Sequence, residues 1–180
     1  MMDIPKLYEL YKTHYLVTTD TRAIPTNSLF FALKGDKFNG NSFAAQALSL
    51  GARFAIIDEK AYQTDKRMIL VADALQTLQD LANYHRKQLQ LPIIGLTGSN
   101  GKTTTKEILG AILTQKYKAV VTEGNLNNHL GVPFTLLRLD ETHEMAIVEM
   151  GANKPGDIKE LVEIAEPTHG VITNIGAAHI

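Results

Sequence analysis

One short stretch constrains the fold more than any other part of the chain: residues 95–105, which read GLTGSNGKTTT. An apolar run over 93–96 leads into a glycine-rich turn, and a helical pattern opens at Lys102. A strand that ends in a tight turn and continues as a helix is the first half of a strand–helix–strand unit, which requires a parallel sheet with helices on its faces. Strand and helix patterns also alternate along the rest of the chain, so we predict the α/β class.

The turn in this stretch has the features of a phosphate-binding loop. Its glycines let successive backbone N–H groups point into one concavity, and the helix N-terminus adds positive potential. Lys102 can reach the β- and γ-phosphates, and the Thr103 hydroxyl can bind Mg²⁺. The usual pattern has a glycine where Leu96 stands, and here Gly95 and Gly98 flank that position. A plain surface turn is the alternative, but the strand–loop–helix context argues against it. We predict a site for a nucleoside triphosphate and Mg²⁺ made by Thr97, Gly98, Ser99, Asn100, Gly101, Lys102, Thr103 and Thr104.

The pattern before Pro92 differs from the pattern after it, which indicates two domains. We predict a small mixed α/β domain over 1–72, and a parallel-sheet nucleotide-binding domain of the P-loop type over 73–180, with a helix over 73–90 as connector. The other expected elements are helices over 3–12, 43–50, 102–115 and 155–165, strands over 29–33, 53–57, 68–71, 119–122, 145–150 and 171–175, and a loop over 35–41.

Two polar side chains follow predicted strands of the second domain. Glu149 closes the strand at 145–150, and the carboxyl edge of an open α/β sheet is where ligands bind. A carboxylate there can hold Mg²⁺ opposite the phosphate loop. His179 follows the last strand and can ligate a second cation or contact phosphate. The alternatives are a glutamate that caps the next turn and a histidine that packs. We assign catalysis to Lys102, Glu149 and His179, and metal binding to Thr103, Glu149 and His179.

Asn125, Asn127 and Asn128 lie within four positions of one loop. Amide side chains both donate and accept hydrogen bonds, which suits a polar ligand such as a sugar or a peptide. The alternative is a turn that uses asparagine for left-handed geometry. Three asparagines exceed what one turn needs, so we favour ligand binding.

The composition excludes several classes of function. Lys and Arg number 18 and Asp and Glu 19, for a net charge of −1, so nothing favours nucleic-acid or anionic-membrane binding. The absence of cysteine excludes disulfides, thiolate catalysis and Cys-ligated zinc. No apolar run reaches the roughly 18 residues of a membrane span, and no signal peptide is evident. We expect a cytoplasmic monomer without nucleic-acid or membrane partners.

Five segments resemble the Mur ligases, and within them the MurF branch. They are GLTGSNGKTTTKEIL (95–109), TEGNLNNHLGVPFTLLRL (122–139), EMGANKPGDI (149–158), ITNIGAAHI (172–180) and TDTRAIPTNSLFFALKGDKFNGNSF (19–43). The last is similar to the family's uridine-nucleotide-binding domain. It has Asp20-Thr21-Arg22 where Asp-Ser-Arg is usual, and Asn39-Gly40-Asn41 where Asp-Gly-His is common.

The resemblance implies an ATP-dependent carboxylate–amine ligase of peptidoglycan precursor synthesis. ATP would phosphorylate the terminal carboxylate of a UDP-N-acetylmuramoyl tripeptide, and the amine of D-alanyl-D-alanine would attack the acyl phosphate. Residues 1–72 would then bind the UDP-muramoyl substrate. Lys102 would stabilise the transferring group, Thr103 and Glu149 would hold one Mg²⁺, and His179 a second. The implied substrate contacts are Thr21, Arg22, Leu33, Lys34 and Gly35 at the UDP end and Asn125, Asn127 and Asn128 towards the ATP.

The same resemblance implies that the ATPase domain is truncated. Family members carry a carbamylated lysine downstream of the histidine that matches His179, and a C-terminal domain that closes over ATP. The sequence ends at Ile180, before either, so we expect this chain to be inactive alone. The alternatives are another ligase of the superfamily, such as a folylpolyglutamate-synthase-like or MurE-like enzyme, and a non-catalytic UDP-sugar-binding module. The segments at 122–139 and 149–158 argue against the first alternative.

Overall fold

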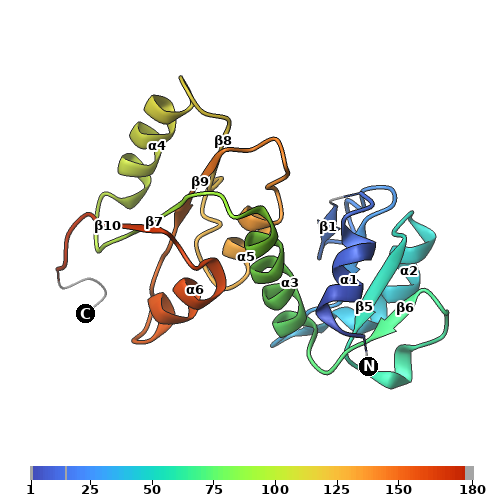
Figure 1. Cartoon of the computed structure of the whole chain (residues 1–180). Helices are drawn as coiled ribbons and strands as arrows, with labels where there is room; N and C mark the ends of the chain where they lie inside the picture. Colours follow the sequence, from blue (N-terminus) through green and yellow to red (C-terminus); the bar gives the residue numbers. More distant parts are fainter. Residues whose placement is uncertain (1, 15, 177–180) are drawn as a thin grey trace. The chain divides into compact units, whose positions relative to one another are not determined.

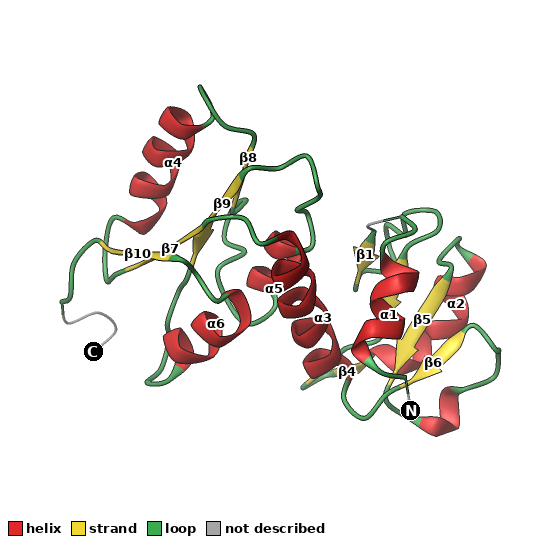
Figure 2. Cartoon of the chain, viewed as in Figure 1, coloured by secondary structure: helices red, strands yellow, loops and turns green. Residues whose placement is uncertain are grey.

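The structure is a computed structural model that describes residues 2–14 and 16–176 (Figure 1). The chain divides into two compact units, Met1–Tyr84 and His85–Ile180. Each unit has its own four-stranded sheet, and helices lie beside the strands in both (Figure 2). The predicted α/β class is therefore confirmed. No helix in the described ranges is both long and apolar enough to span a bilayer.

The first unit is a parallel sheet with the strand order β1-β2-β5-β6. Its core forms where small and large apolar side chains of β2, α2 and β5 meet, with Phe30, Ala47 and Ile57 all buried. The strand β1 is not among the elements expected from the sequence. The elements of this sheet and its helices are α1 (Ile4–Tyr11), β1 (Val17–Thr18), β2 (Leu29–Phe31), α2 (Ala44–Ser49), β5 (Phe54–Ile57), η2 (Lys60–Tyr62) and β6 (Met68–Leu70).

The segment expected as a loop over 35–41 contains a small hairpin. Its strands, β3 (Lys34–Gly35) and β4 (Phe38–Asn39), pair antiparallel, and a 3₁₀ helix, η1 (Gly40–Phe43), follows. The expectation of a loop is wrong here because strands of two residues leave no periodic pattern. The backbone closes tightly at Gly40, where an added Cβ would collide with the carbonyl oxygen of Leu33.

The helix α3 (Ala74–Leu89) begins where the sequence predicts, because Asp73 Oδ1 accepts a hydrogen bond from the Gln76 amide over 2.8 Å. The division between the two compact units falls within this helix, between Tyr84 and His85. The domain boundary predicted after residue 72 stays a prediction.

The second unit is a parallel sheet with the strand order β10-β7-β9-β8. Figure 1 shows α4 on one side of these strands and α5 with α6 on the other. The central strands are covered on both faces, so they are mostly apolar without alternation up to their carboxyl ends, where Thr97 and Glu149 stand. The elements are β7 (Ile93–Thr97), α4 (Lys102–Leu113), β8 (Ala119–Val121), α5 (Gly131–Leu136), β9 (Met145–Glu149), α6 (Asp157–Ala165) and β10 (His169–Ile172).

The start of α6 and the bounds of β10 differ from the prediction for reasons that the structure shows. The helix α6 begins at Asp157 rather than at Pro155 because Gly156 adopts a φ of 97° and the Asp157 carboxylate accepts hydrogen bonds from the amides of Asn153 and Lys154. The last strand lies over His169–Ile172 instead of 171–175. The residues that follow it turn towards the phosphate loop instead of extending the ladder.

Candidate active site

The phosphate loop and Glu149 lie at the same edge of the second sheet. The strands β7 and β9 are parallel neighbours, and Leu96 lies opposite Glu149 in their register. Residues that follow these two strands therefore share the carboxyl edge, where open α/β sheets bind their ligands. Thr103 Oγ1, in the first turn of α4, lies 3.5 Å from Glu149 Oε1. The two residues predicted to hold Mg²⁺ in the described part of the chain are thus brought together.

Two glycines shape the phosphate loop. Gly98 has a φ of 141° and Gly101 a φ of 78°, which L-residues with side chains rarely adopt. A Cβ on Gly98 would also collide with Thr173 Oγ1. Lys102 folds back over the loop, and its Nζ donates a hydrogen bond to the Gly98 carbonyl over 2.7 Å. The predicted lysine is therefore at the loop, with its ammonium beside the concavity.

The segment after β10 holds the other side of the loop. The Ser99 amide donates to the Asn174 carbonyl over 3.1 Å, and the Asn100 amide donates to Asn174 Oδ1 over 3.0 Å. Thr173 Oγ1 donates to the Asn100 carbonyl over 2.6 Å. Sequence reasoning missed Asn174, although an amide side chain directly after a strand of the same sheet was the signal that could have found it.

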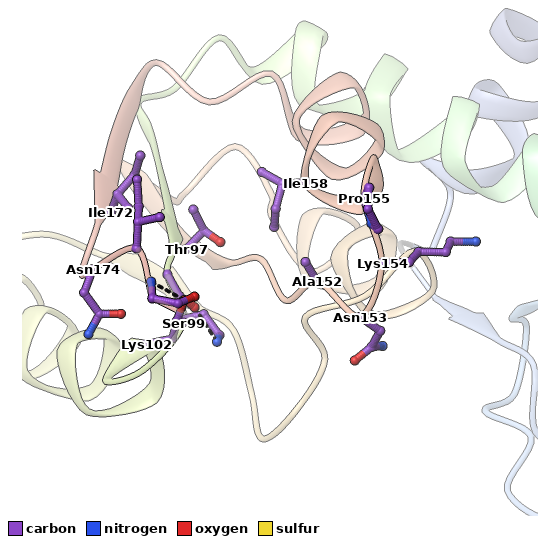
Figure 3. A pocket seen from close by; sticks show the side chains of 13 residues that line it. Thr97, Ser99, Lys102, Ala152, Asn153, Lys154, Pro155, Ile158, Ile172 and Asn174 are labelled. Carbon is purple, nitrogen blue, oxygen red and sulfur yellow. Dashed lines mark hydrogen bonds between the residues drawn. The ribbon is translucent and has the colours of Figure 1, made fainter. Parts of the chain in front are cut away.

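Two cavities meet at Lys102. The larger, of about 470 Å³, lies between the phosphate loop with Asn174 on one side and residues 152–155 on the other (Figure 3). The second, of about 340 Å³, is lined by Lys102, the three asparagines of the 125–128 loop and residues 151–153. Lys102 thus borders both a space beside the phosphate loop and a space beside the asparagine loop.

Glu149 is buried at the base of this region. Its Oε1 accepts a hydrogen bond from Asn127 Nδ2 over 2.8 Å, while its Oε2 has no hydrogen-bond partner among the residues that the structure describes. Lys106 Nζ lies 3.8 Å from Oε2. A buried carboxylate needs compensation by cations or donors. Within residues 2–14 and 16–176, no three His, Asp or Glu side chains gather as a metal cluster. Two oxygen donors beside the phosphate loop are the Glu149 carboxylate and the Thr103 hydroxyl.

That donor set fits Mg²⁺. The ion prefers oxygen ligands, and it is commonly held by one or two protein groups while phosphate oxygens and water complete its coordination. Glu149 supplies a carboxylate, Thr103 supplies a hydroxyl, and both lie next to the phosphate loop.

Comparison with known proteins identifies the family that has this arrangement. Residues 96–180 match the Mur ligase middle domain, and residues 13–86 match the family described as Mur ligase family, catalytic domain. The chain belongs to the Mur ligase family. The family predicted from the sequence is therefore confirmed.

Several similar proteins carry the name of the D-alanyl-D-alanine-adding ligase or of MurF. A UDP-N-acetylmuramoyl-tripeptide–D-alanyl-D-alanine ligase from Synechocystis is 45% identical over 166 residues, which are 91% of this chain and 37% of the relative. MurF from Acinetobacter baumannii matches with a TM-score of 0.83 and 42% identity over 91% of this chain and 36% of that one. MurF from Thermotoga maritima, solved in complex with ADP, matches with a TM-score of 0.84 and 35% identity over 99% of this chain and 40% of that one. The chain spans little more than a third of the length of these relatives.

The asparagine loop of this Mur ligase divides its roles among its three asparagines. Asn127 contacts Glu149, as described. Asn128 Oδ1 accepts hydrogen bonds from the amides of Leu130 and Gly131, which closes the turn before α5. Asn125 accepts the Asn127 amide with its carbonyl oxygen and borders the second cavity. Asn128 therefore has a structural role through its Oδ1 atom, but none of the three asparagines adopts the left-handed geometry that the alternative assumed.

The candidate substrate residues of the first unit lie on its surface. Arg22 pairs with Asp20 through its guanidinium at 2.6 Å, and these hydrogen bonds lower the pKa of Asp20 to about 2. Lys34 Nζ lies 3.2 Å from Asp58 Oδ1 and 3.6 Å from Glu59 Oε1. The other candidates are Thr21, in the turn after Asp20, Leu33, before the hairpin, and Gly35, in β3. His179 lies outside the described residues.

Proposed function

We propose that this chain provides the UDP-substrate-binding and ATP-binding parts of a ligase that joins D-alanyl-D-alanine to a UDP-N-acetylmuramoyl tripeptide. The names of its relatives support this reaction. The observation that carries the proposal is the pairing of Thr103 with a buried Glu149 beside a phosphate loop. An ADP complex of the Thermotoga relative supports ATP as the nucleotide. The monomeric state, the cytoplasmic location and the absence of nucleic-acid and membrane partners stay predictions.

The residues of the loop bind and orient the nucleotide. Amides at the start of α4 face its phosphates, and Lys102 Nζ exchanges the Gly98 carbonyl for a phosphate oxygen when ATP is bound. Thr103 and Glu149 would hold Mg²⁺, which when bound neutralises phosphate charge. Asn127 keeps Glu149 Oε1 in place with its hydrogen bond. Phosphoryl transfer depends mainly on such positioning and charge stabilisation.

The first step of the proposed reaction joins two reactants, the nucleotide and the tripeptide carboxylate. The terminal carboxylate of the tripeptide attacks the γ-phosphorus, the bond to the bridging oxygen of ADP breaks, and an acyl phosphate forms. The amine of D-alanyl-D-alanine then attacks the acyl carbon, and inorganic phosphate leaves with the C–O bond electrons. Because Lys102 borders both cavities, we assign the larger one to the nucleotide and the asparagine-lined one to the acceptor carboxylate.

The remaining predicted residues complete the proposal. Thr21, Arg22 and residues 33–35 would contact the UDP end of the substrate. Arg22 and Lys34 supply positive charge for a diphosphate, and both exchange an internal carboxylate partner for it. His179 would help to hold a second cation.

Binding and ligation can be tested separately. The 180-residue chain should bind MgATP in calorimetry, and Lys102→Ala should weaken binding by about tenfold or more, because a charge-assisted contact to phosphate is lost. Lys159→Ala, at an exposed lysine of α6, is the matched control. Ligation is measured on the protein as the cell makes it, as phosphate release that requires both the UDP-linked tripeptide and D-alanyl-D-alanine. Phosphate release when one of the two substrates is left out would contradict the proposed reaction. Ligase activity of Lys102→Ala within tenfold of the parent would contradict the role of Lys102.

A further inference from the structure

One buried cation in the second unit has no role in the mechanism above. The side chain of Lys106, in α4, has no exposed surface. Lysine is almost never fully buried unless it is paired, because removing an ammonium from water is costly. Lys106 lies one helical turn after Lys102, so both side chains lie on the same side of α4. The helix therefore carries one lysine at the phosphate loop and a second beneath it.

The partner of Lys106 inside the protein is Glu149. Lys106 Nζ lies 3.8 Å from Glu149 Oε2, and the Glu149 side chain is only 2% exposed. Nζ also donates to the Gly124 carbonyl over 3.4 Å, which links it to the start of the asparagine loop. Its third partner, Glu107 Oε1 at 3.0 Å, belongs to a side chain that is 68% exposed, so water screens that contact.

The two oxygens of Glu149 face different surroundings. Oε1 contacts Asn127 and lies next to Thr103. Within the described part of the chain, Oε2 has no hydrogen bond, and it lies 3.8 Å from Lys106 Nζ. One oxygen is therefore directed to the candidate cation site and the other to a fixed positive charge.

We propose that Lys106 is a positioning residue that acts as the permanent counter-ion of Glu149 and so makes cation binding depend on the nucleotide. The pair is neutral overall, so Glu149 alone offers a divalent cation little net attraction. The phosphates of ATP supply the missing negative charge, and the cation enters with them. This inference rests on the proposed function, because it takes MgATP as the ligand of the site.

The charge balance predicts what happens when the ammonium is removed. In Lys106→Met, Glu149 is a buried carboxylate without a counter-ion, which destabilises the fold. A divalent cation then replaces the missing charge, so the variant binds metal without nucleotide. A lysine that merely fills space in the core would destabilise the protein on removal but would not create metal binding.

The test compares metal binding and thermal unfolding of the 180-residue chain in the absence of nucleotide. We expect Lys106→Met to lower the Tm by several degrees, to regain part of that loss in millimolar Mg²⁺, and to bind Mn²⁺ about tenfold more tightly than the parent. Lys159→Met, the matched control at an exposed lysine, should behave like the parent, and Lys106→Arg should keep cation binding weak. Adding Glu149→Gln to Lys106→Met should abolish the new metal response and restore stability. The proposal is overturned if Mg²⁺ does not raise the Tm of Lys106→Met and if this variant binds Mn²⁺ no more tightly than the parent does.

Two outcomes keep this test decisive. If Lys106→Met does not fold, the double variant with Glu149→Gln should fold, because no unpaired charge is left; failure of both overturns the counter-ion role. The metal arms contain no nucleotide, so they stand even if the parent binds no MgATP. Loss of MgATP binding in the parent would contradict the proposed function instead.

Discussion

Asn127 donates a hydrogen bond from Nδ2 to Glu149 Oε1 over 2.8 Å, and this contact joins the asparagine loop to the end of β9. The same loop is attached a second time, because the Gly151 amide donates to the Asn127 carbonyl over 2.7 Å. The side-chain bond orients the candidate metal ligand, and the backbone bond holds the loop. The two functions can therefore be separated by changing the side chain alone.

We predict that Asn127→Ala weakens Mn²⁺ binding in the presence of ADP by about tenfold to a hundredfold, because partners that orient a metal ligand contribute that much. The free energy of unfolding should change little, since the backbone hydrogen bonds of the loop remain. Manganese titration followed by electron paramagnetic resonance measures the affinity. Asn125→Ala, in the same cavity lining, is the control, and equal affinities for Asn127→Ala and the parent would refute the orienting role.

Asn174 offers a second test, this time of the phosphate loop. Its Oδ1 accepts from the Asn100 amide, whereas its backbone carbonyl accepts from the Ser99 amide. Asn174→Ala removes only the first acceptor, so we expect faster hydrogen exchange at Asn100 than in the parent and little change at Ser99. Exchange measured by NMR resolves the two amides. Asn153→Ala, across the cavity, should alter neither, and unchanged exchange at Asn100 in Asn174→Ala would show that this bond does not order the loop.

The relation between Thr103 and Glu149 could be predicted from the sequence. Glycines, a lysine and a hydroxyl in a strand–loop–helix pattern define the loop locally, and parallel strands bring their carboxyl ends to one edge. The roles of Lys106 and Asn174 could not be predicted in this way. Each depends on a partner far away in the chain, and the pattern of α4 does not reveal that its second lysine is buried against Glu149.

The misjudged elements have equally specific causes. The hairpin of β3 and β4 is too short for a periodic pattern, and its segment reads as a loop by composition. The end of β10 depends on the Asn174 carbonyl and side chain, which bond to the phosphate loop rather than to a neighbouring strand. In both places, contacts with distant residues decide the local structure.

The first unit contains a carboxylate with a buried side chain, Asp58, whose contribution to stability should be present at neutral pH and lost in acid. Burial raises the pKa of Asp58. Hydrogen bonds from the Asn41 side chain and the Ala74 amide, together with the Lys34 ammonium, lower it by more, so the pKa lies below its usual value. A lowered carboxyl pKa stabilises the fold above the unfolded value, near 4, and this contribution is lost as the pH falls through the folded pKa.

We therefore predict that Asp58→Asn destabilises the chain by about 1–3 kcal/mol at pH 7, because a charged acceptor of several hydrogen bonds is lost. The difference in the free energy of unfolding between Asp58→Asn and the parent should shrink as the pH falls below about 4. Urea unfolding at a series of pH values measures both effects. Asp36→Asn, at an exposed position of the hairpin turn, should match the parent throughout. A difference that does not depend on pH would mean that the charge of Asp58 contributes nothing.

His85 gives the second unit the opposite kind of titrating group, a buried base. Its Nε2 donates to the Leu139 carbonyl over 2.8 Å, and burial lowers the pKa of the imidazole, outweighing the Leu139 carbonyl and Asp140, which raise it. The folded protein then holds a neutral ring, while the unfolded chain takes up a proton below about 6.5. Stability from this group is present above that pH and is lost as the pH falls, with a slope of at most about 1.4 kcal/mol per pH unit.

NMR titration should give His85 a pKa below 6.5, and in His85→Gln the loss of stability between pH 7 and pH 5.5 should be smaller than in the parent. His169→Gln, at an exposed histidine of β10, should keep the parental slope; a His85→Gln slope equal to the parental one would refute the prediction.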